Sequence, residues 1–232
     1  MRILLVTDQF PNSLQPTRST YNRHHYRAIA DLGHEVRVLA PVMTFPGARL
    51  LGKGVKVPRV EDIDGLPVVH PHFLRTPGMF IHHHHKMYRW SVKKHFMRMI
   101  RDFQPDHIQI SFAYPDGVAI APLCQQLGIP YSIAVLGSDY YIRGRQPHFR
   151  RMVLETLTAA PLIVCPGQAL KDAMIADGLP GDQIVPFNNG VDHRLFHPGN
   201  TKDKREKTIL FVGNLYPVKR ADRLLTAWQL VL

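Results

Sequence analysis

The feature that most constrains this chain is a regular alternation between short apolar runs and segments with helical spacing. The apolar runs predict strands at 3–6, 35–41, 66–70, 107–112, 131–137, 161–167 and 183–190. The helical spacing predicts helices at 19–33, 82–103, 115–128, 147–159 and 168–178. Apolar strands that alternate with helices form parallel βαβ units, with helices on both faces of one sheet. The sequence therefore predicts an α/β fold.

The same pattern locates the loops that can bind a ligand. In parallel α/β sheets, ligands bind beyond the carboxyl ends of the strands, which here lead into loops 8–18, 111–117, 137–145 and 188–192. Loop 8–18 contains no glycine, although a dinucleotide-binding loop needs glycines for its tight turn and for close approach to pyrophosphate. No strand–helix loop carries the GxxxxGK(S/T) pattern either. Dinucleotide and P-loop sites are therefore disfavoured.

A change in composition near residue 200 predicts two domains. Residues 1–196 hold the alternating strands and helices, and 197–207 are polar and charged with Pro and Gly, which is typical of a linker. The stretch after the linker reads as a fresh strand, a turn and the start of an amphipathic helix. We therefore expect 208–232 to begin a second domain.

Charge and cysteine content narrow the class of protein. The net charge of +11 indicates an anionic partner, namely a phosphorylated ligand, an anionic membrane or nucleic acid, or else a solvated basic surface. Cys124 and Cys165 lie in apolar segments outside any CxxC pair, as reduced cytosolic thiols do. The N-terminal apolar run is too short for a signal peptide, and no run is long enough to span a bilayer. We expect a cytoplasmic protein.

The predicted helix 82–103 has two different faces. Its apolar stripe comprises Tyr88, Val92, Phe96, Met99 and Phe103. The rest of its surface carries six cations with Trp90 and Met97, which suits the inner face of an anionic plasma membrane. The alternative is a solvated cationic face, with the two apolar residues covered by the irregular segment 42–66. A nucleic-acid partner is not expected, because neither aromatic residues on a sheet face nor a recognition motif is visible.

A run of four histidines, 82–85, stands at the start of this helix. No cysteine or carboxylate lies within a helical turn to complete a ligand set, so we expect a solvated helix terminus and no metal site. Three carboxylates, Asp8, Asp116 and Asp139, lie at predicted strand ends, where each can cap the following helix. Asp116 is placed to cap its helix or bind a ligand, and Asp139 has less reason to be a cap. Lys219 and Arg220, at a helix start, make either a phosphate site or a generic basic terminus.

Five motifs occur in a fixed order along the chain: GHEVRVLAP, YPDG, LGSD, NNGVDHRLFHP and ILFVGNLYPVKRADRLLTAW. Together they resemble glycosyltransferase family 4, the retaining enzymes of GT-B fold, and the resemblance covers essentially the whole chain. It implies two Rossmann-like domains, the first holding the acceptor and the second a nucleotide-sugar donor, with no metal or other cofactor. On this resemblance, 208–232 is the truncated start of the donor domain.

The resemblance also assigns roles to matched positions. Asp116 and Asp139 are expected at sugar hydroxyls as the catalytic residues. Lys219 matches the lysine that binds the donor diphosphate, beside Gly213 and Asn214, and Asn214 stands where the family has an arginine. Substrate binding is assigned to Arg18 (for an anionic acceptor group), Ser111, Tyr114, Ser138, Asn189 and Gly190.

Two hypotheses about function follow from this resemblance. The first is a glycosyltransferase that acts on a glycan or lipid-linked acceptor in polysaccharide or cell-envelope biosynthesis, incomplete as this chain. The second is a non-catalytic module that binds an acceptor or a membrane, because two family histidines are replaced by Ser111 and Leu136. The apolar residues of the second domain need to be covered by other residues, which predicts self-association or a separate chain that supplies the donor domain. The apolar residues concerned are Leu210, Phe211, Leu224, Leu225 and Trp228.

Overall fold

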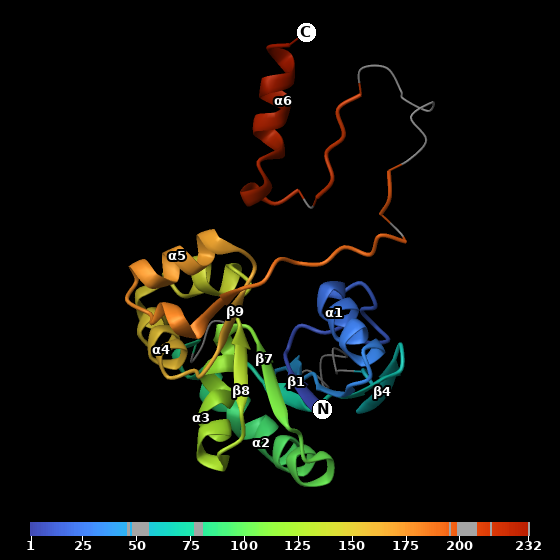
Figure 1. Ribbon diagram of the computed structural model, residues 1–232, viewed down its shortest axis with the longest axis vertical. Coiled ribbons are helices and arrows are strands. Elements are labelled where there is room, and N and C mark those ends of the chain that lie inside the picture. Colours follow the sequence, from blue (N-terminus) through green and yellow to red (C-terminus); the bar gives the residue numbers. More distant parts are fainter. Residues whose placement is uncertain are drawn as a thin grey trace. The chain divides into compact units, whose positions relative to one another are not determined.

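The computed structural model describes residues 1–45, 47, 56–76, 81–194, 196–198, 208–213 and 215–231. The chain divides into two compact units, Met1–Gly190 and Val191–Leu232. The first unit is the α/β domain that carries helices α1 to α5 in Figure 1. The domain boundary predicted at 196 lies a few residues beyond this unit, and the predicted linker 197–207 lies almost wholly outside the described residues.

The first unit is built on a sheet whose eight described strands follow the order β10-β9-β8-β7-β1-β2-β5-β4. Their bounds are β1 Arg2–Val6, β2 Glu35–Leu39, β4 Val60–Ile63, β5 Leu66–Val69, β7 His107–Ser111, β8 Tyr131–Ala134, β9 Ile163–Cys165 and β10 Ile184–Pro186. Neighbouring strands are parallel except β4 and β5, which form an antiparallel hairpin. The strand order reverses between β1 and β7, and such a switch point is where α/β sheets bind ligands.

Helices cover both faces of this sheet. They are α1 Thr20–Asp31, α2 His84–Phe103, α3 Val118–Leu127, α4 Pro147–Thr158 and α5 Gln168–Ala176. Side chains of β1 alternate between the two faces, so Leu5 packs in the cluster that contains Tyr26 of α1. Leu4 packs in the larger cluster with Tyr88 of α2 and Ile120 of α3, and these two helices lie next to each other (Figure 1). The predicted Rossmann-like α/β fold is confirmed.

The main difference between the predicted and the observed fold lies in segment 42–66, which was predicted to be irregular. It contains the strands β3 (Val42–Thr44) and β4, and β3 pairs with a further strand, β6 (His72–Leu74), that the sequence reading missed. Strands of three or four residues show too little alternation to be recognised without their partners. Pro46 and 48–55, which belong to the same segment, lie outside the described residues.

The face of α2 that points away from the core is largely exposed. Trp90 is 76% exposed and Met97 is 37% exposed. The described residues, including those of segment 42–66, therefore leave both side chains uncovered. At the start of the helix, by contrast, His84 and His85 are buried. The prediction of a solvated terminus is wrong for these two, because they lie three and four residues before Tyr88 and extend its buried stripe. Within the described ranges no helix is long and apolar enough to cross a membrane.

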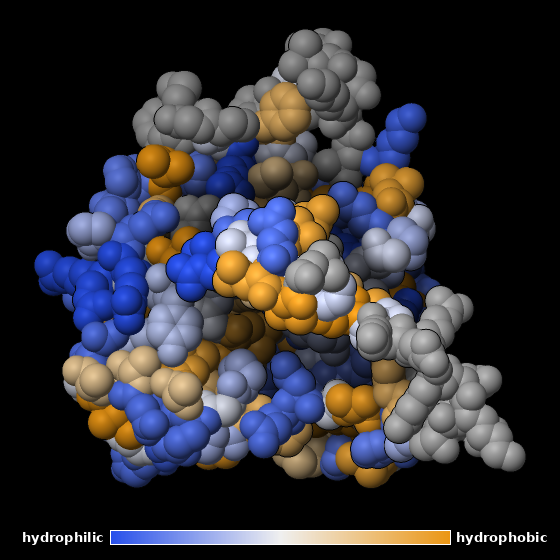
Figure 2. Space-filling view, turned by 90° about the horizontal axis from the view of Figure 1, so that it is seen from above, coloured by the Kyte–Doolittle hydropathy of each residue, from blue (hydrophilic) through white to orange (hydrophobic). Residues whose placement is uncertain are grey.

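The second unit contains one described α-helix, α6 (Ala221–Gln229), which follows a short 3-10 turn at Pro217–Lys219. The strand predicted from Thr208 is not formed in its described part, 208–213, because a strand needs a neighbour for its backbone hydrogen bonds. Leu210 and Leu225 are 81% and 67% exposed, as expected for apolar residues without cover. Figure 2 shows such apolar surface, in orange, beside hydrophilic surface on the face it draws.

Candidate functional site

A cavity of about 530 Å³ lies at the carboxyl ends of β1 and β7, where the strand order reverses. Its walls come from the loops after β1, β7 and β8 and from the segments around β6, α1, α2 and α4. We name it the strand-end cavity. The residues that line it are Asp8, Gln9, Tyr21, Phe73, Arg75, Ile81, His84, Phe112, Tyr114, Pro115, Ser138, Asp139, Ile142 and Phe149.

The lining of the strand-end cavity combines charges of both signs with hydroxyls and aromatic rings. Two carboxylates, Asp8 and Asp139, share the cavity with the guanidinium of Arg75. The rings of Tyr114 and Phe149 lie 4.8 Å apart and form part of its apolar wall. A cavity with a few polar groups on an apolar wall suits a ligand that carries many hydroxyls, such as a sugar.

Asp8 lies two residues after the end of β1 and is held by the surrounding loop. Its backbone N–H donates to Asp116 Oδ1 over 3.0 Å, and Gln9 Nε2 donates to Asp8 Oδ1 over 3.1 Å. Arg18 Nη2 donates to the Asp8 carbonyl over 2.9 Å, so Arg18 braces the loop and does not line the cavity. Burial raises the pKa of Asp8, while Gln9 and then Arg18 oppose that rise.

Asp116, predicted to be catalytic, lies behind the cavity wall with 0% exposure. Its Oδ1 accepts hydrogen bonds from the Tyr88 hydroxyl and the Asp8 N–H, and α3 shows no side-chain cap. Burial, followed by the nearby charge of Asp8, raises the pKa of Asp116 well above its usual value. In this geometry Asp116 positions Asp8 and Tyr88; its catalytic role stays a prediction.

Asp139 lines the cavity and joins two of its loops. Its Oδ2 accepts the N–H of Ala113 over 2.8 Å, and its Oδ1 accepts the N–H groups of Leu136 and Gly137, each over 3.0 Å. Burial raises the pKa of Asp139, and the three backbone donors oppose that rise. The predicted position at the site agrees with the structure, whereas its contact with a substrate stays a prediction.

The remaining predicted substrate residues fall into two groups. Tyr114 and Ser138 line the strand-end cavity. Ser111 is buried behind it, with its Oγ 3.4 Å from Asn22 Oδ1. Asn189 and Gly190 are exposed at the end of the first unit. The structure therefore brings two of these positions to the cavity and leaves the others outside its lining.

The cavity residues that were not among the predicted site residues include Asp8, Tyr21, Arg75 and His84. His84 Nε2 lies 3.1 Å from the Thr76 carbonyl, which ties α2 to the segment after β6. Its place on the buried stripe of α2 was a signal that could have been used. Asp8 had the same strand-end signal as Asp116 and Asp139. Tyr21 and Arg75 had no comparable signal, because the chain brings them to the cavity only through tertiary packing.

The predicted diphosphate site lies in the second unit. Lys219 is exposed and ends the turn Pro217–Lys219. Arg220 has a positive φ of 53° and forms an ion pair with Asp222 over 3.0 Å. Gly213 is exposed, and Asn214 lies outside the described residues. In the described ranges, no group of three or more His, Cys, Asp or Glu side chains is arranged to hold a metal ion.

Comparison with solved structures identifies the fold. A sucrose-phosphate synthase from Thermosynechococcus elongatus aligns with a TM-score of 0.60 and 16% identity, over 86% of this chain and 50% of that chain. Anabaena HepE, solved in complex with UDP, aligns with a TM-score of 0.53 and 16% identity, over 84% of this chain and 46% of that chain. At this identity the likeness shows a shared fold.

Comparison of sequences identifies the family. TuaC of Bacillus subtilis, which is named as a teichuronic acid biosynthesis glycosyltransferase, is 30% identical over 165 residues. The alignment covers 66% of this chain and 42% of TuaC, so the chain spans about half the length of the relatives it matches. Residues 19–195 match the model of Glycosyltransferase Family 4. The match takes in all the residues of the strand-end cavity except Asp8 and Gln9. Because it covers well over half of the sequence, the chain belongs to glycosyltransferase family 4.

Proposed function

We propose that this chain forms the acceptor side of a retaining glycosyltransferase of the hexosyltransferase type. The enzyme transfers a sugar from a nucleotide sugar to a glycan or lipid-linked acceptor in polysaccharide or cell-envelope biosynthesis. Family membership supports the transferase activity, and the name of TuaC supports the pathway class. The structure of HepE with UDP supports a nucleotide-sugar donor. The observation that carries the proposal is the strand-end cavity at the switch point of the sheet.

In the proposed complex the acceptor sugar occupies the strand-end cavity. Asp8 and Asp139 accept hydrogen bonds from its hydroxyls, and the rings of Tyr114 and Phe149 pack against its apolar face. Arg75 pairs with an acidic group of the acceptor. Arg75 thereby takes the role that the sequence analysis assigned to Arg18. An acidic saccharide fits this cation and the polymer for which TuaC is named.

The proposed reaction replaces one bond at the anomeric carbon of the donor. The acceptor oxygen bonds to that carbon as its bond to the diphosphate breaks, on the same face of the sugar. The acceptor proton passes to the departing diphosphate, so no cofactor and no metal are required in this proposal. Lys219 stabilises the charge that develops on the diphosphate, as cations do at leaving groups.

The outer face of α2 suits attachment to the inner face of an anionic membrane. Trp90 and Met97 are exposed among Lys86, Lys93 and Lys94, and all five lie on one side of the helix. Lipid-linked acceptors lie at such a surface. Sedimentation with vesicles of neutral lipid, with and without phosphatidylglycerol, tests this attachment, and Trp90→Ala is expected to weaken it. Equal binding of the wild type and Trp90→Ala to anionic vesicles would argue against this attachment.

The test of the proposed function is a transfer assay on the full chain. UDP-linked and TDP-linked hexoses are supplied with teichuronic acid fragments or neutral glycans, and products are measured by mass spectrometry. The anomeric configuration of any product is then read by NMR. Transfer with retention that is lost in Arg75→Gln supports the proposal. Transfer with inversion, or transfer unaffected by changes in the cavity, contradicts it.

The alternative function is an acceptor-binding module without transfer. It is favoured by Ser111, which stands where the family has a histidine and is buried away from the cavity. This reading predicts saccharide binding that depends on Arg75, with no product from any nucleotide sugar. Product formation, with this chain alone or with a second chain that supplies the donor domain, rules it out.

A further inference from the structure

A second cavity, of about 360 Å³, lies between the edge of the main sheet and α2. It shares no lining residue with the strand-end cavity. Val60, Val69, Pro71 and Met99 form its apolar wall. We name it the basic pocket, because every ionisable side chain that lines it is basic: Arg59, His70, His72, His95 and Arg98.

The two arginines of the basic pocket lack a salt-bridge partner among the described residues. Neither the Arg59 nor the Arg98 side chain forms an ion pair or a hydrogen bond within the described part of the chain. Other arginines of the first unit do: Arg27, for example, pairs with Asp31, and Arg150 pairs with Asp177 over 2.7 Å. Two guanidiniums therefore face one cavity without a salt bridge to the described residues, and the acidic influence on Arg98 is an electrostatic interaction with Asp102, four residues further along α2.

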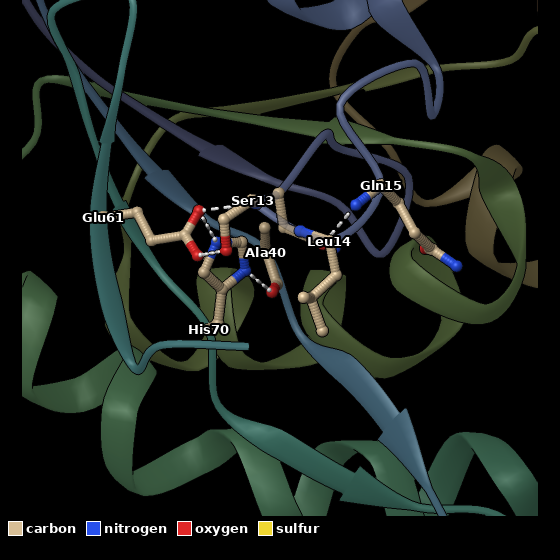
Figure 3. A network of polar contacts seen from close by, with 7 residues as sticks. Ser13, Leu14, Gln15, Ala40, Glu61 and His70 are labelled. Carbon is tan, nitrogen blue, oxygen red and sulfur yellow. Dashed lines mark hydrogen bonds and ion pairs between the residues drawn. The ribbon is translucent and has the colours of Figure 1, made fainter. Parts of the chain in front are cut away.

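One carboxylate near this pocket, Glu61, is directed away from the two arginines. Glu61 accepts the Ser13 hydroxyl over 2.7 Å and the Ser13 N–H over 3.1 Å, and it does not line the pocket. Its Oε2 lies 3.7 Å from Nε2 of the buried His70, whose Nδ1 lies 2.9 Å from the Ala40 carbonyl (Figure 3). Glu61 is therefore occupied by Ser13 and His70 and leaves the arginines unpaired.

The local field at the pocket is positive. His95, on α2, has its pKa lowered first by burial and then by Arg98, Arg59 and Lys94. Two of these cations are the arginines of the pocket itself: Arg59, which immediately precedes β4, and Arg98 on α2. An anion bound among them would offset this repulsion.

We propose that the basic pocket binds a phosphate-bearing ligand, whose phosphate oxygens are held by the guanidiniums of Arg59 and Arg98. Planar guanidiniums bind phosphate through paired hydrogen bonds and keep their charge at all physiological pH values. The ring nitrogens of His95 add a donor, and the apolar wall packs against the carbon part of the ligand. The source of the phosphate is a soluble phosphorylated molecule or a lipid headgroup. This site is separate from the proposed acceptor site and does not depend on it.

The test uses inorganic pyrophosphate as the probe and the full chain. NMR follows the ring proton of His95, which is assigned by its loss in His95→Gln, while calorimetry gives the affinity. Pyrophosphate is expected to shift this signal saturably. Arg59→Gln/Arg98→Gln is expected to weaken that binding about tenfold or more. The matched control, Arg151→Gln/Arg223→Gln, removes the same charge from exposed positions of α4 and α6 and is expected to retain it.

A second arm distinguishes the two sources of phosphate. Sedimentation compares vesicles of phosphatidylcholine with vesicles that also contain phosphatidylglycerol. If pyrophosphate leaves His95 unmoved but anionic vesicles bind in a manner that needs Arg59 and Arg98, the ligand is a lipid headgroup. If neither probe depends on these two arginines, or if the control pair weakens binding as much, the proposal is overturned.

Discussion

The two cavities of the first unit lie on the same sheet but differ in how their charges are compensated. In the strand-end cavity, Asp139 is satisfied by three backbone N–H groups and Asp8 faces Arg75, so both signs are present. In the basic pocket, Glu61 is occupied by Ser13 and His70, and the side chains of Arg59 and Arg98 form no salt bridge with the described residues. The comparison indicates that the positions of the carboxylates, more than the sheet itself, determine whether a cavity suits a ligand with hydroxyls or an anion.

The largest expected effect comes from the buried network behind the strand-end cavity. Asp116→Ala leaves the Tyr88 hydroxyl and the Asp8 N–H without an acceptor, and should lower the free energy of unfolding by about 3 kcal/mol. Asp116→Asn keeps one acceptor oxygen and should cost less than half as much. Urea unfolding measures both variants. Equal losses for Ala and Asn would show that the hydrogen bonds are not what stabilises this side of the cavity.

The basic pocket provides the contrast to that result. Arg59→Gln/Arg98→Gln changes exposed side chains without protein partners, so the free energy of unfolding should stay within about 0.5 kcal/mol of wild type. A loss as large as that of Asp116→Ala would break the comparison, since it would make the arginines structural.

At the loop junction of the strand-end cavity we expect a loss of unfolding free energy smaller than that of Asp116→Ala. Asp139→Ala removes the acceptor for the N–H groups of Ala113, Leu136 and Gly137, and should cost about 2 kcal/mol. Asp172→Ala, at an exposed aspartate of α5, is the matched control and should change little. Hydrogen exchange at Leu136 and Gly137 should accelerate in the first variant alone. Unchanged exchange there would exclude the bracing role of Asp139.

Ligand-dependent stability sharpens the comparison further. Pyrophosphate at ten times its dissociation constant should raise the free energy of unfolding by about 1.4 kcal/mol. The same concentration should give an increase of about 0.4 kcal/mol or less in Arg59→Gln/Arg98→Gln, where binding is about tenfold weaker or more. Thermal unfolding with and without pyrophosphate measures this difference. An equal increase in both proteins would place the anion elsewhere.

The pH dependence of stability has a defined sign. The folded-state pKa of Asp116 is raised above the ordinary value of 3.8, so between these two values the folded protein binds more protons than the unfolded one. The contribution of Asp116 to stability is therefore greatest at low pH and falls as pH rises above about 4. The difference in unfolding free energy between wild type and Asp116→Asn should fall by about 1 kcal/mol per pH unit there. A difference that grows with pH would contradict this assignment.

Local and distant features were not equally accessible from the sequence. The longer strands of the main sheet, the helices α1 to α5 and the helix end at Gly128, whose φ is +66°, follow from local patterns and agree with the structure. The position of Asp139 at the cavity also followed, because strand ends meet at one edge of a parallel sheet. The membership of glycosyltransferase family 4 came from motifs spread over the chain, and it is confirmed.

The rest depends on contacts between distant parts of the chain. Asp116 meets Asp8, 108 residues away, and Tyr88, 28 residues away, so its burial could not be read from its own neighbours. The short strands β3 and β6 are defined by each other, and Arg75 reaches the cavity only because β6 is formed. The separation of Glu61 from Arg59 and Arg98 likewise rests on its bonds to Ser13.

The central claim is that the strand-end cavity binds the acceptor, and the most direct measurement is the affinity for an acidic saccharide. Calorimetry with a teichuronic acid fragment should show saturable binding, about tenfold weaker in Arg75→Gln, which loses a charged hydrogen bond. Arg59→Gln/Arg98→Gln should bind the fragment as wild type does. Binding that is unchanged in Arg75→Gln but lost in the arginine pair would contradict the account, because it would move the acceptor to the basic pocket.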